Sequence, residues 1–196
     1  MTEKPTIVFA GDSITEGGRW QEWFPDVEAV NLGRGGDTTE GLIERLDEVT
    51  ALDPDTVVLL IGTNDVANRR AVEQVVRNIE TILVMLRQAL PDARILVQSV
   101  LPRGAEYAEF LKEINRHVWQ FAATVKAHYL DLWPVMALED GRLNEAYTDD
   151  GLHLNEAGYE AWLSELVPGV ERVRDLPPSS RPIRLPELNA LNALDE

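Results

Sequence analysis

Residues 56–65 read Thr-Val-Val-Leu-Leu-Ile-Gly-Thr-Asn-Asp, an apolar run that ends abruptly in glycine and polar residues. A strand with one face in water alternates apolar and polar side chains, whereas a strand covered on both faces is apolar throughout. The run therefore predicts a buried strand over residues 56–61. Stretches that predict further strands lie at residues 7–10, 28–32, 95–100 and 129–132.

Helical patterns separate these strands, with apolar residues recurring every three or four positions. Strand–helix alternation predicts a parallel sheet with helices on both faces and right-handed crossovers. The expected fold is α/β: a three-layer α/β/α sandwich around a flavodoxin-like parallel sheet of about five strands in the order 2-1-3-4-5. The predicted helices cover residues 40–49 with Thr39 as the cap, 72–86, 110–125, and 155–167 with Asn155 as the cap.

The length of 196 residues predicts one domain with an appendage. Residues 1–167 form the expected domain, and residues 168–196 a Pro-rich C-terminal arm that holds five of the 11 prolines. Leucines 188, 191 and 194 recur within this arm at a spacing of three. Three interpretations of the arm stay open: it lies on its own domain, it reaches a second subunit in a homodimer, or it is disordered.

Charge and composition exclude several classes of function. The 18 Lys+Arg against 34 Asp+Glu give a net charge of −16, which disfavours nucleic acid and anionic membranes as partners. With Cys 0, a disulfide framework, a thiolate metal site and a cysteine nucleophile are excluded. Even the longest apolar stretches, such as residues 57–61, are far short of a membrane span, and the N-terminus lacks a secretory pattern. We therefore expect a cytoplasmic protein without a membrane span.

Polar residues follow the carboxyl ends of four predicted strands, at 11–13, 33–37, 62–65 and 149–153. In open α/β sheets, ligands bind beyond these ends, at the point where the strand order reverses. In the order 2-1-3-4-5, strand one lies between strands two and three. The loops after those two strands are therefore expected to flank Ser13 from opposite sides.

These polar residues suit nucleophilic catalysis. A serine hydroxyl needs a base within hydrogen-bond reach, and the chain has three histidines. His117 lies within a predicted helix and His128 at the amino end of a strand, so both are expected outside the site. His153 lies three residues after Asp150, which is near enough to orient its imidazole. Ser13, His153 and Asp150 are therefore the predicted nucleophile, base and orienting acid.

The negative charge of a tetrahedral intermediate requires preorganised hydrogen-bond donors. The predicted oxyanion hole consists of the backbone N–H groups of Ser13 and Gly36 and the side-chain amide of Asn64. Two further parts of the sequence supply candidate substrate contacts. Arg103 follows the fourth strand, and Trp20, together with Trp23, follows the nucleophile closely enough to wall the crevice.

The motifs resemble those of the SGNH (GDSL-type) serine hydrolase superfamily. Gly-Asp-Ser-Ile at 11–14 is similar to its first block, with Ile in place of the common Leu. Residues 31–39 resemble the second block, residues 62–65 the third and residues 150–154 the last. Placed on the family pattern, the oxyanion-hole glycine falls on Gly36. The resemblance covers roughly residues 5–167.

Within the superfamily, the chain most resembles the catalytic subunits of the intracellular platelet-activating-factor acetylhydrolases. The Gly-Gly-Asp-Thr-Thr run at 35–39 and Leu-Pro-Arg-Gly at 101–104 carry this likeness. It implies a serine esterase that hydrolyses short-chain esters, acetyl esters in particular, of a sugar or lipid without metal or cofactor, in a fold that commonly dimerises. A longer-chain lysophospholipase or thioesterase of the same superfamily is the alternative.

Two interpretations from other classes remain. A non-catalytic, flavodoxin-like module would hold a small ligand in the same loops, although nothing in such a module requires Asp150 and His153 to be three residues apart. A metal-dependent phosphoesterase would use the aspartates that follow the strands, because hard cations prefer carboxylate oxygens. These aspartates are Asp12, Asp37, Asp65 and Asp150.

Overall fold

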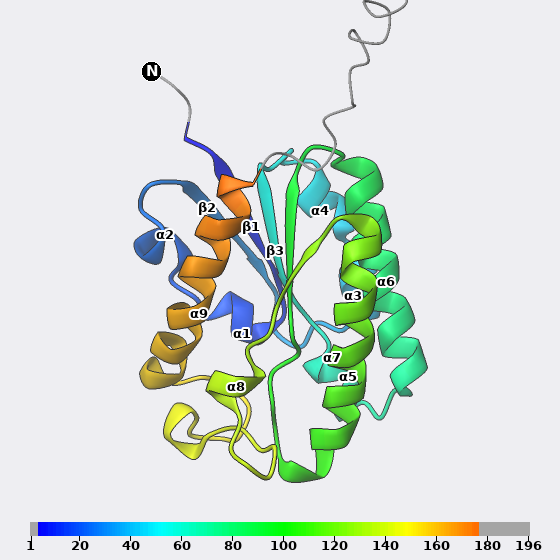
Figure 1. Ribbon diagram of the computed structural model, residues 1–196, viewed down its shortest axis with the longest axis vertical. Coiled ribbons are helices and arrows are strands. Elements are labelled where there is room, and N and C mark those ends of the chain that lie inside the picture. Colours follow the sequence, from blue (N-terminus) through cyan, green and yellow to red (C-terminus); the bar gives the residue numbers. More distant parts are fainter. Residues whose placement is uncertain (1–3, 177–196) are drawn as a thin grey trace, which may run out of the picture.

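The computed structural model describes residues 4–176, and its centre is a five-stranded sheet in the order β2-β1-β3-β4-β5 (Figure 1). Every neighbouring pair of strands is parallel. The predicted α/β class and strand order are therefore confirmed. The strands are β1 (Thr6–Gly11), β2 (Glu28–Gly33), β3 (Thr56–Leu60), β4 (Arg94–Gln98) and β5 (His128–Leu130).

Helices connect the strands and cover both faces of the sheet, in the three layers expected. The longer helices are α6 (Val72–Ala89), α7 (Ala108–Ala122) and α9 (Glu156–Asp175). The short helices are α1 (Ser13–Glu16), α2 (Trp20–Trp23), α3 (Thr39–Glu44), α4 (Leu46–Thr50), α5 (Thr63–Ala67) and α8 (Trp133–Met136). Three 3-10 turns are η1 (Ala105–Tyr107), η2 (Ala123–Val125) and η3 (Glu145–Tyr147).

The two faces of the sheet carry separate cores, because successive residues of a strand point in opposite directions. Val8 and Val57 pack with buried residues of α3, α4, α6 and α7. Phe9 and Val58 pack on the opposite face with buried residues of α1, α2, α8 and α9. Figure 1 shows these two groups of helices on either side of the sheet. Burial on both faces explains why β3 contains no charged residue.

Helix α9 runs to Asp175, so the prediction that this helix ends at Val167 is wrong. Pro168 lies inside it, although proline removes one helical hydrogen bond at a cost of about 3 kcal/mol. Beyond the proline, Val170 and Val173 are 1% and 3% exposed, and their burial against the sheet offsets that cost. The remainder of the expected arm, residues 177–196, lies outside the described residues.

The predicted single helix over 40–49 is two helices, which meet at Arg45. The cap of the first of them, α3, is Thr38 in place of the predicted Thr39, since Thr38 Oγ1 accepts from the Gly41 N–H at 3.2 Å. Arg45 has φ −118° and ψ 18°, outside the helical region, and its side chain is buried. The break directs this arginine toward the ends of β1 and β2.

The carboxyl ends of the strands all lie at the lower end of the sheet in Figure 1, where α1, α5 and α8 begin. The long loop between α8 and α9, which contains Asp150 and His153, reaches the same end. Among residues 4–176, no helix is both long and apolar enough to cross a membrane.

Candidate active site

Ser13 is the first residue of α1 and follows directly on β1. Asp12 caps this helix, with Oδ1 accepting from the Ile14 N–H at 3.0 Å. The turn is tight: a side chain at Gly11 would place a Cβ 2.2 Å from the Leu60 carbonyl oxygen. The local sequence thus presents the serine hydroxyl at the carboxyl edge of the sheet.

His153 meets Ser13 although 140 residues separate them, with 3.1 Å between Ser13 Oγ and His153 Nε2. On the other side of the imidazole, Nδ1 lies 2.7 Å from Asp150 Oδ2. An ionised carboxylate only accepts, so Nδ1 carries the proton and Nε2 is free to accept from the serine. The structure therefore brings the three predicted catalytic residues into one chain of hydrogen bonds.

Asp150 is held by local contacts alone. Its Oδ1 accepts from the backbone N–H groups of Leu152 and His153, at 2.9 Å and 2.7 Å. The hydrogen bond from the His153 side chain, followed by these backbone bonds, holds the pKa of Asp150 well below its usual range. The carboxylate consequently stays ionised at neutral pH, as an acid that orients a histidine requires.

The glycine loop after β2 approaches α5, which brings two predicted oxyanion donors together. Asn64 Nδ2 donates to the Asp37 carbonyl oxygen at 2.8 Å, next to Gly36. Because an amide has two N–H bonds, a second donor remains on Asn64. Gly36 has φ +76°, which favours glycine, and a Cβ built there would meet nothing within 4 Å. Glycine at this position therefore serves the backbone conformation and leaves the surface above it open.

Arg45 holds this loop against the ends of two strands. Its Nε donates to Asp37 Oδ2 at 2.7 Å, and Nη2 donates to the carbonyl oxygens of Gly11 and Leu32 at 3.1 Å and 3.0 Å. Sequence reasoning missed this residue. Its spacing could have indicated it, because Arg45 lies three residues after Leu42 and four before Val49, and so on the predicted buried face of the helix.

A second buried contact joins α3 to α5. Asp65 accepts from the Thr39 N–H at 2.9 Å and from the Thr39 hydroxyl at 2.6 Å. Asn78 of α6 donates to the same hydroxyl at 2.9 Å. These contacts fix the turn that carries Asn64.

Asp12 is also buried, only 1% exposed. Burial raises the pKa of Asp12 to about 7, and the charge of Asp37 adds to the effect. Nearby, the Tyr159 hydroxyl donates to the Ile14 carbonyl oxygen at 2.7 Å. Burial, followed by the charge of Asp12, raises the pKa of Tyr159 to about 12, so this tyrosine is a neutral hydrogen-bond donor.

Of the two predicted substrate contacts, the structure places only Arg103 beside the site. Its Nη1 donates to the Thr63 carbonyl oxygen at 2.9 Å, next to Asn64. Trp20 is 2% exposed and stacks on Phe9 with ring centroids 4.1 Å apart, so the expectation that it walls the crevice is wrong. Trp23 is half-buried and lines a surface hollow that also includes Leu154.

The other two histidines lie outside the site, as expected. His117 pairs with Glu113 on α7 at 3.1 Å, and His128 begins β5 at the opposite end of the sheet. Within residues 4–176, no group of three or more His, Cys, Asp or Glu side chains could hold a metal ion. The aspartates that motivated the phosphoesterase alternative are bonded to protein donors.

Comparison with known proteins identifies the family. The model of the GDSL-like lipase/acylhydrolase family matches residues 9–161. Over 168 residues, the chain is 34% identical to platelet-activating factor acetylhydrolase IB subunit alpha1 of Rattus norvegicus, covering 80% of this chain and 71% of that protein. The alpha2 subunit of the same species is 32% identical over 168 residues, covering 80% and 72%.

A GDSL-like lipase from Bacteroides thetaiotaomicron superposes with a TM-score of 0.77 at 26% identity, covering 85% of this chain and 88% of that one. The chain therefore belongs to the GDSL-like lipase/acylhydrolase family. It is a carboxylic ester hydrolase, and its predicted resemblance to the platelet-activating-factor acetylhydrolases is confirmed.

Proposed function

We propose that this chain hydrolyses short-chain esters, acetyl esters above all, through an acyl-enzyme formed on Ser13. One observation carries the proposal: the unbroken series of hydrogen bonds from Asp150 through His153 to Ser13, 2.7 Å and 3.1 Å long. A serine becomes an effective nucleophile when a base accepts its proton and a third group orients that base.

In the first half of the reaction, Ser13 Oγ attacks the acyl carbonyl while His153 Nε2 takes its proton. Asp150 stabilises the imidazolium that forms. The tetrahedral intermediate then collapses, the bond to the leaving oxygen breaks, and His153 gives the proton to that oxygen. In the second half, water attacks the acyl-enzyme by the same route and releases the carboxylic acid.

The negative charge of each tetrahedral intermediate falls on the former carbonyl oxygen. We assign its stabilisation to the backbone N–H groups of Ser13 and Gly36 and to the second N–H of the Asn64 amide. The buried Arg45–Asp37 pair supports this assignment, because it fixes the loop in advance of substrate binding.

The preference for acetyl esters rests on similarity, since the two mammalian relatives named above are acetylhydrolases. The leaving group in this proposal is a sugar or lipid alcohol, with Arg103 at the rim as its contact. Longer-chain ester or thioester hydrolysis is the competing specificity.

Hydrolysis of p-nitrophenyl acetate, butyrate and octanoate in the presence of EDTA tests these points together. We expect the highest kcat/KM on acetate and a loss of at least about 10⁴-fold in Ser13→Ala. Preference for octanoate would replace the acetyl assignment with the longer-chain one. An active Ser13→Ala protein, or a wild type that neither turns over these esters nor reacts with a fluorophosphonate probe, would refute the mechanism.

A homodimer that involves the C-terminal arm stays a prediction. Deleting residues 177–196 tests it while keeping Leu176, whose carbonyl oxygen accepts from Arg94 at 2.8 Å. If the arm joins two subunits, light scattering will show a dimer for the full chain and a monomer for the truncated one. An unchanged mass would exclude that role.

A further inference from the structure

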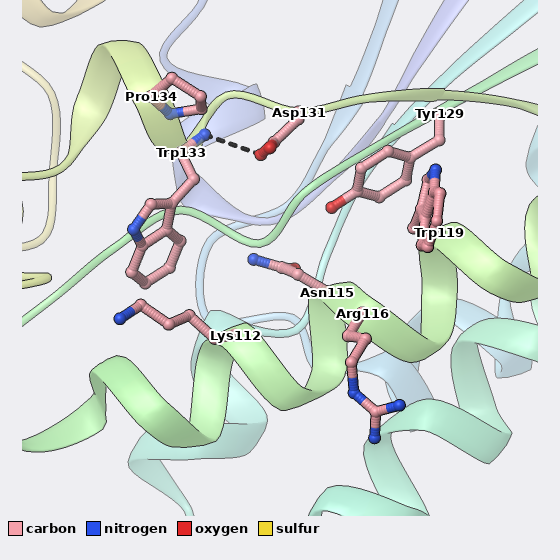
Figure 2. Close-up of a pocket in the computed structure, with 8 residues that line it drawn as sticks. All are labelled: Lys112, Asn115, Arg116, Trp119, Tyr129, Asp131, Trp133 and Pro134. Atoms are coloured by element: carbon pink, nitrogen blue, oxygen red, sulfur yellow. Dashed lines mark hydrogen bonds between the residues drawn. The ribbon is translucent and has the colours of Figure 1, made fainter.

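A hollow of about 550 Å³ lies beside the edge strand β5, between α7 and α8. Figure 2 shows the side chains that line it. Its volume falls within the range of roughly 300–1,000 Å³ typical of small-molecule sites. None of the proposed catalytic residues lines it, so the function proposed above does not account for it.

Aromatic rings form two ends of this hollow. Figure 2 shows Trp119 and Trp133 on opposite sides, with the ring of Tyr129 beside Trp119. Trp119 is 59% exposed, more than any other large hydrophobic side chain among residues 4–176. Stacking a ligand on an indole face that is open to water breaks few existing contacts, and it removes a large apolar area from water, which is favourable.

Polar groups stand between the two indoles. Figure 2 shows the Asn115 amide, the Asp131 carboxylate and the Tyr129 hydroxyl in the space between the rings. Asn115 uses one N–H and its oxygen to bind the backbone of Val100, at 3.0 Å and 2.7 Å. Asp131 accepts from the Trp133 N–H at 3.0 Å through Oδ1. One N–H of the amide and one oxygen of the carboxylate therefore remain for a ligand.

The cations at the rim are already neutralised. Lys112 pairs with Glu109 at 3.1 Å, and Arg116 pairs with Glu113 through two hydrogen bonds. An anionic ligand would have to displace the two glutamates from these cations. A plain hydrocarbon chain would cover the second N–H of the Asn115 amide and the second oxygen of the Asp131 carboxylate without offering either a partner, which is unfavourable. The lining therefore suits an uncharged ring with apolar C–H faces and hydroxyl groups along its edge.

We propose that this hollow is a saccharide-binding site, in which a neutral pyranose ring stacks on Trp119 or Trp133 and its hydroxyls bind Asn115 and Asp131. The second oxygen of the Asp131 carboxylate accepts from a sugar hydroxyl, and the second N–H of the Asn115 amide donates to a hydroxyl oxygen. Because Ser13 takes no part, this site does not depend on the proposed esterase mechanism.

The indole N–H signals of the ¹⁵N-labelled full chain provide the test, with xylotriose, cellotriose and maltotriose as probes at millimolar concentrations. We expect the signals of Trp119 and Trp133 to shift saturably with at least one probe. The buried Trp20 and Trp162, which lie in the opposite core, serve as internal controls and stay unchanged. Assignment follows from single Trp→Phe variants.

Two substitutions localise the binding. Trp119→Ala should weaken it about tenfold, since the exposed indole supplies the stacking surface. Asp131→Asn keeps an acceptor for the Trp133 N–H but loses the carboxylate charge, so it should weaken binding severalfold. Met85→Ala, at an exposed apolar position on α6, is the matched control and should bind as the wild type.

The proposal fails if none of the three oligosaccharides shifts an indole signal, or if Trp119→Ala binds as tightly as the wild type. If the full chain binds no sugar, light scattering shows whether Trp119→Ala changes the mass of the protein in solution. If the mass changes, the hollow would be an interface between copies of the chain.

Discussion

The two halves of the candidate active site are held in opposite ways. The half that carries Ser13, Gly36 and Asn64 rests on buried ionisable side chains: Asp12, Arg45 and Asp65 are only 1%, 6% and 2% exposed. The half that carries the base is open to water, with the side chains of His153 and Asp150 about 51% and 54% exposed.

The two halves should therefore contribute differently to folding stability and to activity. Buried charges are stable only while they are paired, so removing one partner is costly to folding. Exposed hydrogen bonds within four residues of each other contribute little to folding because water replaces them readily. We therefore expect substitutions in the buried half to change stability and activity together, and substitutions in the exposed half to change activity alone.

The largest expected effect is that of His153→Ala. Without a base for Ser13, kcat should fall by about 10⁵-fold, while the free energy of unfolding changes by less than about 0.5 kcal/mol. Ester turnover and urea unfolding measure the two quantities. His117→Ala, an exposed histidine on α7, is the control and should keep wild-type kcat. A large loss of stability in His153→Ala would contradict the proposed independence of the exposed half.

Next in size is the effect of Arg45→Met on stability. It leaves the Asp37 carboxylate buried without its cation and removes one donor each from the Gly11 and Leu32 carbonyl oxygens. The free energy of unfolding should therefore decrease by about 3–5 kcal/mol. Arg34→Met is the matched control, because Arg34 pairs with Glu48 on the surface. Its expected cost is below about 1 kcal/mol. Equal thermal midpoints for the two variants would show that burial of the Arg45–Asp37 pair does not stabilise the loop.

The same contrast explains which parts of the site could be predicted from the sequence. Asp150 and His153 are three residues apart, and their contact is local, so their spacing alone indicated it. Ser13, Gly36 and Asn64 follow strands, and a parallel sheet brings such positions to one edge whatever their distance along the chain. Alternation of strands and helices predicted a parallel sheet, the flavodoxin-like strand order was adopted as its expected topology, and the site followed from that order.

The supporting contacts could not be predicted, because they depend on which side chains tertiary packing brings together. Arg45 binds carbonyl oxygens that are 34 and 13 residues away, and no local pattern encodes those partners. Trp20 was expected at the crevice because it follows the nucleophile closely, but stacking on Phe9 turns it into the core. Pro168 was expected to end a helix, yet burial beyond it outweighs the lost hydrogen bond.

Asn64→Ala tests the side-chain donor of the buried half. It removes the proposed contact with the oxyanion and also the hydrogen bond to the Asp37 carbonyl oxygen. We expect kcat to fall by about 10²–10³-fold with little change in KM, because the contact forms mainly in the transition state. Asn78→Ala is the control: it disturbs the Thr39 hydroxyl in the same network but offers no donor to substrate. Equal losses of kcat in both variants would assign Asn64 a purely structural role.

Asp12 should also make the stability of the protein depend on pH. Burial raises the pKa of Asp12 to about 7, from the ordinary 3.8, so the folded protein keeps a proton that the unfolded chain releases. The contribution of Asp12 to the free energy of unfolding should therefore decrease as pH rises from about 4 to about 7. Asp12→Asn keeps an acceptor for the Ile14 N–H and removes the ionisation. Relative to the wild type, this variant should become steadily more stable across that range and level off above it.

Urea unfolding at several pH values measures the difference in the free energy of unfolding, with the exposed Asp26→Asn as control. A difference that is constant with pH would mean that Asp12 is not penalised by its burial, and that the buried half tolerates this charge as readily as the exposed half tolerates Asp150.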